Sequence, residues 1–73
     1  MNKFSLLLKT YMYEKNIRQI DIAAKLGTTQ NAVSKTLKGE NVTLDQMIKY
    51  ADAVDCDLEI KLVPRNNIWF FYL

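Results

Sequence analysis

Apolar residues recur at helical spacing in four short stretches of this 73-residue chain. In residues 4–12 they follow the i, i+3, i+4, i+7, i+8 pattern, which places them on one face of an α-helix. Shorter stretches with a similar period follow at residues 19–26, 30–38 and 44–54. The sequence therefore predicts a mainly helical fold with four helices, each of which buries one side against the others.

Residues that favour helix ends separate the four stretches. The residues expected at the starts of the helices are Asn2 or Ser5, Arg18, Thr29 and Thr43. The residues expected at or just past the ends are Asn16, Gly27, Gly39 and Asp55 or Asp57. Thr43 gives the clearest signal, because Gln46 follows three residues later and the two can form a capping box. Arg18 breaks the pattern, since Ser, Thr, Asp or Asn is usual there, and a broken local rule can mark function.

The four helices are expected to bury different amounts of apolar surface. The side chains expected to face the core are Phe4, Leu7, Leu8, Tyr11 and Met12 in the first helix, Ile22, Ala23 and Leu26 in the second, Val33 and Leu37 in the third, and Leu44, Met47, Ile48, Ala51 and Val54 in the fourth. The third helix thus has a narrow apolar edge. Such a helix supports a core poorly and is better explained as one that presents its polar face to a partner.

The last residues of the chain change from helical period to period two. Apolar Leu58, Ile60 and Leu62 alternate with charged residues, and the turn-forming residues 64–67 follow. Residues 68–73 are then all apolar and include four consecutive aromatic side chains. This pattern predicts a β-hairpin in which 58–63 pairs with 68–73. A lone hairpin is marginal in water, so another surface must cover it.

Composition excludes several functions. The chain has no histidine, which removes imidazole-based catalysis and metal ligation, and its one cysteine, Cys56, cannot form an internal disulfide. Residues 55–59 alternate acidic groups but lack the glycine and glutamate of a calcium loop. No apolar run reaches the roughly 18 residues of a membrane span. We therefore expect a cytoplasmic protein that is not an enzyme and needs no cofactor, metal or membrane.

Basic residues gather in one part of the chain. Residues 15–38 contain five basic side chains and one acidic side chain, whereas the whole chain has a net charge of only +2. A localised basic patch of this kind favours an anionic partner. A solvated face on a small protein is the alternative explanation of the charge alone.

The segment Gln19 to Gly39, QIDIAAKLGTTQNAVSKTLKG, resembles the helix–turn–helix of the Cro/C1-type (XRE) DNA-binding family, and its LGTTQ stretch is similar to that of lambdoid phage repressors. The resemblance covers roughly residues 4–55. It implies a four-helix, lambda-repressor-like domain, here with a C-terminal β-strand or β-hairpin. We expect residues 1–57 to form the DNA-binding part and residues 58–73 a dimerisation segment of the same single domain.

The resemblance also assigns roles to side chains. The third helix would enter the major groove, and its expected base contacts are Gln30, Asn31, Ser34 and Lys35. The expected contacts with the DNA backbone are Arg18, Gln19, Thr29, Lys38 and Asn41. Two positions depart from the family pattern. Arg18 replaces the usual hydroxyl cap, and Thr36 stands where an apolar residue is common. The family's fifth helix is replaced by residues 58–73.

The leading interpretation is a sequence-specific regulator, a repressor that binds an inverted-repeat site in double-stranded DNA as a homodimer, in a bacterial cell or encoded by a phage. The expected dimer interface consists of Leu62, Ile68, Trp69, Phe70, Phe71 and Tyr72. The alternative is a protein-interaction module on the same fold, such as an antitoxin or a phage accessory inhibitor. In that case the aromatic tail binds a second protein and DNA binding is autoregulatory.

Overall fold

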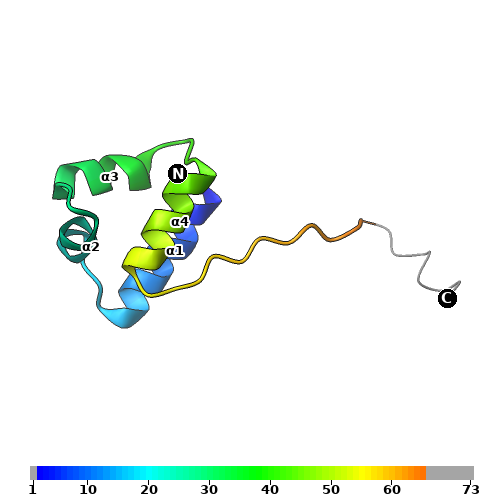
Figure 1. Cartoon of the computed structure of the whole chain (residues 1–73), viewed down its shortest axis with the longest axis horizontal. Helices are drawn as coiled ribbons and strands as arrows, with labels where there is room; N and C mark the ends of the chain where they lie inside the picture. The colour runs from blue at the N-terminus through cyan, green and yellow to red at the C-terminus, as the bar shows by residue number, and fades with distance from the viewer. Residues whose placement is uncertain (1, 66–73) are drawn as a thin grey trace, which may run out of the picture.

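The computed structural model describes residues 2–65, in which four α-helices follow one another along the chain (Figure 1). Their bounds are Lys3–Lys15 for α1, Gln19–Leu26 for α2, Gln30–Lys38 for α3 and Leu44–Ala53 for α4. The mainly helical prediction and all four helices are confirmed. In Figure 1, α2 and α3 lie on one side of the molecule and α1 and α4 on the other.

Three of these helices begin at a residue whose side chain caps the helix. Asn2 caps α1, because its Oδ1 accepts a hydrogen bond from the Ser5 N–H at 2.8 Å. Ser5 itself lies inside α1 and is fully buried, so Asn2 is the cap of the two candidates. Thr43 and Gln46 form the predicted capping box at the start of α4, with distances of 3.2 and 3.1 Å. Thr29 caps α3 through its hydroxyl oxygen.

A residue in the left-handed conformation lies just past the end of three helices. These residues are Asn16 with φ 57°, Gly27 with φ 67° and Asp55 with φ 58°. In each case the N–H of the following residue donates to the carbonyl that lies five residues before it. These hydrogen bonds, of 2.9–3.0 Å, run from Ile17 to Met12, from Thr28 to Ala23 and from Cys56 to Ala51. This is the Schellman arrangement, and it confirms the predicted ends. Gly39 follows α3 as expected but has an extended backbone with φ −67°.

We expect Gly27→Ala to destabilise the protein by about 1 kcal/mol, because a side chain is disfavoured at positive φ. Gly39→Ala is a matched control. Its φ is negative, and an added Cβ would meet its nearest atoms at an ordinary 3.5 Å. Urea unfolding of the two variants measures the difference. Equal losses of stability in both variants would contradict the conformational explanation.

The hydrophobic core joins all four helices. It consists of Leu8, Met12, Ile22, Ala23, Val33, Leu37, Tyr50, Ala53 and Val54. Helix α2 is central to it, since α2 packs against both α3 and α4. Helix α3 contributes only Val33 and Leu37, which confirms its narrow apolar edge.

Three apolar side chains predicted to be buried are exposed instead. They are Leu7 on α1 and Leu44 and Ile48 on α4, with 71%, 53% and 50% of their surface accessible. The helical period defines an apolar face, but the positions of neighbouring helices decide which part of that face is covered. Tyr50 and Ala53 on α4 belong to the core, although the predicted buried face of this helix did not include them.

The C-terminal strand prediction is not confirmed. Residues 58–63 form no strand, and none is found elsewhere in residues 2–65. The predicted partner strand, 68–73, lies outside the described residues. A β-strand needs a neighbour for its backbone hydrogen bonds, and within residues 2–65 this segment has none. After α4 the chain runs away from the helices (Figure 1), leaving Leu62 99% exposed. Within residues 2–65, every helix is too short or too polar to traverse a lipid bilayer.

Candidate nucleic-acid interface

Helix α3 is held by one side and presents the other to solvent. Val33 and Leu37 are 0% and 1% exposed and anchor the helix in the core. The four side chains predicted to read bases are exposed or half-buried; they are Gln30, Asn31, Ser34 and Lys35. Because each lies one, three or four residues from its neighbours, they occupy adjoining positions on the outer surface of the helix. The structure thus brings all four together on the free face of α3.

The turn between α2 and α3 has the geometry that the sequence predicted. Gly27 ends α2 in the left-handed conformation and Thr29 begins α3, so only Gly27, Thr28 and Thr29 separate the helices. Ala23 is 3% exposed and belongs to the core, where its small side chain permits close packing. These features set α2 and α3 as a helix–turn–helix, in which the first helix supports the second.

Residues predicted to contact the DNA backbone surround α3. Lys38 at the end of α3 and Asn41 in the following loop are exposed. Gln19, the first residue of α2, is half-buried. Thr29 is exposed, but its hydroxyl oxygen already accepts a hydrogen bond from the Ala32 N–H at 3.1 Å. Its hydroxyl hydrogen remains the group with which it could donate to a phosphate.

Arg18 is engaged with a neighbouring carboxylate. Its guanidinium forms an ion pair with Asp21 at 3.2 Å, and its backbone N–H donates to the same carboxylate at 2.9 Å. These bonds lower the pKa of Asp21 from its ordinary value of 3.8, and the backbone hydrogen bond has the largest effect. Asp21 therefore makes the half of a capping box in which the third helical residue accepts the N–H of the cap residue, while the Arg18 guanidinium has no acceptor for the other half. The ion pair is mostly exposed, and such pairs are weak, so Arg18 is able to exchange Asp21 for a phosphate.

The other basic residues of the 15–38 segment do not all face the same way. Lys25 pairs with Asp55 at 3.4 Å, beyond the end of α4. The Lys15 ammonium lies 6.0 Å from the centre of the Tyr11 ring on α1. Lys35 and Lys38 are thus the basic side chains of this segment that lie on α3 itself. The basic patch in the sequence is divided in space.

Two interactions that support α3 were not evident in the sequence. The Asn2 Nδ2 donates to the Gly39 carbonyl at 3.0 Å and ties the start of α1 to the loop after α3. The only sequence signal for this contact was the suitability of Asn2 as a cap. Thr36, which departs from the family pattern, donates its hydroxyl to the Ala32 carbonyl at 3.1 Å. Its polar group is therefore satisfied within α3.

Comparison with known proteins agrees with this geometry. A family model described as the Cro/C1-type HTH DNA-binding domain matches residues 8–59, more than half of the chain. The match includes the whole of α2, the turn and α3. Comparisons with curated proteins and with solved structures gave no match. The resemblance noted in the sequence is confirmed, and the chain belongs to the Cro/C1-type helix–turn–helix DNA-binding family.

Proposed function

We propose that this protein is a transcriptional repressor that binds a specific inverted-repeat DNA sequence as a homodimer. The observation that carries this proposal is the exposed polar face of α3, held in place by the fully buried Val33 and Leu37. A helix so anchored is rigid enough to be inserted into the major groove, which is wide enough to admit an α-helix. As a regulator of bacterial or phage genes it would act in the bacterial cytoplasm.

The polar face of α3 supplies base recognition in this proposal. Gln30 and Asn31 lie in the first turn of α3, and an amide side chain is able to pair with both hydrogen-bonding groups of adenine. Lys35 lies one turn further along and would donate to guanine N7 or O6. Ser34 between them is small enough for a direct contact with a base or a phosphate.

Contacts with the DNA backbone position this helix. Lys38 and Asn41 would hold the phosphates at the C-terminal end of α3, and Arg18, Gln19 and Thr29 those near the turn. Such contacts give affinity for any DNA and fix the orientation of the protein, but they carry no sequence information. Arg18 would release Asp21 when it binds a phosphate.

The proposed homodimer fits the geometry of an inverted-repeat site in DNA. A two-fold axis would place two copies of α3 about 34–36 Å apart, on successive major grooves of one face of the duplex. We assign residues 58–73 as the dimerisation segment, with its interface at Leu62, Ile68, Trp69, Phe70, Phe71 and Tyr72. Strand formation by residues 58–63 is proposed for the dimer, where a second copy would offer the backbone partner.

A protein-interaction module on the same fold is the second candidate. The observation in its favour is the exposure of Ile60, Leu62 and Val63, which a different protein could cover. Light scattering during size-exclusion chromatography distinguishes the two. A dimer of the pure protein at micromolar concentration supports the repressor, and a monomer supports the interaction module.

Two substitutions distinguish recognition of the DNA sequence from general affinity for DNA. Gln30→Ala is expected to cost about 1–3 kcal/mol on the cognate DNA and little on random DNA, because it removes a base contact. Lys38→Ala is expected to weaken binding to both, and to reduce the slope of log affinity against log salt by about one unit. Fluorescence anisotropy with a selected operator and a scrambled duplex, over a range of salt concentrations, measures both effects.

The two variants serve as controls for each other, since both residues are exposed and neither belongs to the core. Circular dichroism should show the same helix content in both. If both lose affinity equally on cognate and random DNA, the assignment of Gln30 to base recognition is wrong.

A further inference from the structure

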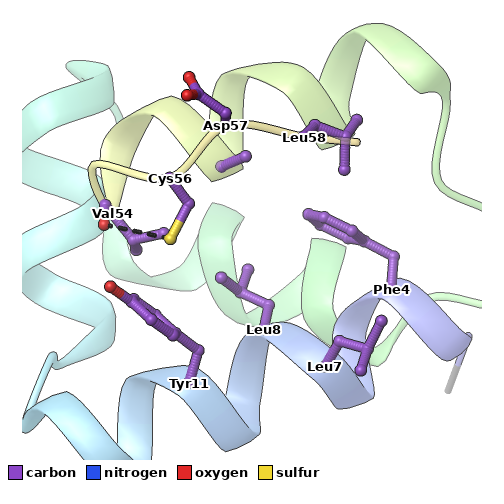
Figure 2. Close-up of a pocket in the computed structure, with 9 residues that line it drawn as sticks. Phe4, Leu7, Leu8, Tyr11, Val54, Cys56, Asp57 and Leu58 are labelled. Atoms are coloured by element: carbon purple, nitrogen blue, oxygen red, sulfur yellow. Dashed lines mark hydrogen bonds between the residues drawn. The ribbon is translucent and has the colours of Figure 1, made fainter. Parts of the chain in front are cut away.

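An apolar groove opens between α1 and the chain that follows α4. Phe4, Leu7, Leu8 and Tyr11 line it from α1, and Ala51, Val54, Cys56, Asp57 and Leu58 line it from α4 and the segment after it. Figure 2 shows the side chains of Phe4, Leu8 and Tyr11 directed from α1 towards Cys56 and Leu58. No lining residue comes from α2 or α3, so an occupant of the groove would leave the polar face of α3 free.

The chemistry of the groove favours apolar side chains as the occupant. Apart from Tyr11, Cys56 and Asp57 the lining side chains are hydrocarbon, and the Cys56 thiol donates to the Val54 carbonyl at 3.6 Å (Figure 2). The neighbouring Cys56 side chain is also the main reason that the pKa of Tyr11 is raised. The groove holds about 180 Å³. This is below the range of roughly 300–1,000 Å³ usual for small-molecule sites.

The apolar surface continues beyond the groove. Leu7 on its rim is 71% exposed, and Ile48 lies one turn before Ala51 on α4 and is 50% exposed. Leu44 is one further turn away on the same side of α4 and is 53% exposed. The segment Ile68–Leu73 has the matching composition, since it is six apolar residues without a charge. Exposed apolar surface of this extent normally marks a contact site.

The path of residues 59–65 favours a second copy of the chain as the source of that segment. Residues 59–65 lead away from the groove (Figure 1), and Ile60 and Leu62 on this path are 62% and 99% exposed. If residues 68–73 folded back on 58–63 of the same chain, the last residue would lie beside Leu58 and the rest beside the exposed path. The segment would then miss most of its own groove.

We propose that the groove between α1 and residues 54–58 receives the apolar segment Ile68–Leu73 of a second copy of the chain. Residues 59–67, fully extended, span up to about 30 Å, which is enough to reach a neighbouring subunit. A two-fold axis makes the exchange reciprocal, so two grooves and two segments are covered at once. This inference rests on the proposed homodimer and specifies what each subunit contributes to it.

The single cysteine makes the exchange directly testable. Cys56 lines the groove, so a cysteine placed in the segment by Phe70→Cys or Tyr72→Cys should form a disulfide with it under mild oxidation. Insertion from a second copy gives a covalent dimer on non-reducing gels. The wild-type chain, and each variant combined with Cys56→Ala, are the controls and should give far less dimer.

A second measurement uses substitutions that leave the core intact. Leu7→Gln, on the rim of the groove, is expected to weaken the dimer at least tenfold in sedimentation equilibrium. Leu6→Gln is the matched control, because Leu6 is on the same helix, is 58% exposed and does not line the groove. Trp69 is the only tryptophan, so its emission should shift to longer wavelength in Leu7→Gln but not in Leu6→Gln.

The outcomes separate this inference from the proposed function. A covalent dimer that requires Cys56, together with a dimer weakened only by Leu7→Gln, supports the exchange. An internal disulfide in a monomer would show that each chain fills its own groove and would overturn it. A wild-type dimer unaffected by Leu7→Gln would also overturn it, while leaving the homodimer and DNA binding in place. A monomeric wild-type protein would overturn both this inference and the homodimer.

Discussion

Replacing Leu37 by alanine is expected to destabilise the protein by about 2–5 kcal/mol. Leu37 is 1% exposed and is one of two side chains that attach α3 to the core. A chain of 73 residues has a total stability of only about 4–11 kcal/mol, at the usual increment per residue. The substitution therefore removes a large part of the free energy of unfolding. Helix α3 should be among the first elements to lose its position.

The same substitution at an exposed leucine is the control. Leu6 is 58% exposed on α1 and does not line the groove, and Leu6→Ala is expected to change stability by about 0.5 kcal/mol or less. Urea unfolding followed by circular dichroism gives both values. A similar small loss for Leu37→Ala would mean that α3 is not held by the core in the way that its burial indicates.

Removing residues 68–73 is expected to lower affinity for the full inverted repeat by about 100-fold or more. The truncated protein should be a monomer, which binds one half-site at a time and loses the advantage of the second. Its helical circular dichroism should persist, because among residues 2–65 the buried side chains of residues 8–54 already form a core that joins all four helices. Light scattering and anisotropy measurements check the mass and the affinity.

A DNA duplex that carries a single half-site provides the control for this truncation. Affinity for that duplex should change little, since the polar face of α3 is intact. A truncated protein that remains a dimer and binds the full site normally would show that residues 68–73 are not the dimerisation element. A loss of affinity that is equal on half-site and full site would instead point to damage in the DNA-binding surface.

Local interactions in this chain were predictable because they depend on neighbouring residues. Thr43 and Gln46 form a capping box wherever the backbone begins a helix, and Gly27 ends a helix because positive φ suits glycine. The four helices and the helix–turn–helix followed from such signals and from the apolar period. The outward position of Gln30, Asn31 and Lys35 also followed, since a helix with one narrow buried edge must expose its other positions. Their role in reading DNA stays a prediction that rests on the family resemblance.

Ion pairs and burial could not be predicted in the same way. The pairing of Arg18 with Asp21 and of Lys25 with Asp55 divides a basic segment that looks continuous in the sequence. The bond from Asn2 to Gly39 joins residues that are 37 positions apart. The Lys25–Asp55 pair and the Asn2–Gly39 bond depend on where helices lie relative to one another, which a local pattern does not contain. The Arg18–Asp21 pair is local, since its residues are three positions apart at the start of α2.

Local sequence signals located the four helices, because caps and turns act over three to five residues. The choice between Asn2 and Ser5 at the first start was made only by the structure. The tertiary structure decided which apolar side chains those helices bury. Leu7 and Ile48 satisfy the helical period but have no helix in residues 2–65 to cover them, whereas Tyr50 is 6% exposed and belongs to the core. A periodic pattern selects a face, but burial requires a partner surface at the right distance. The exposed apolar side of α1 and α4 and the groove beside it are the result.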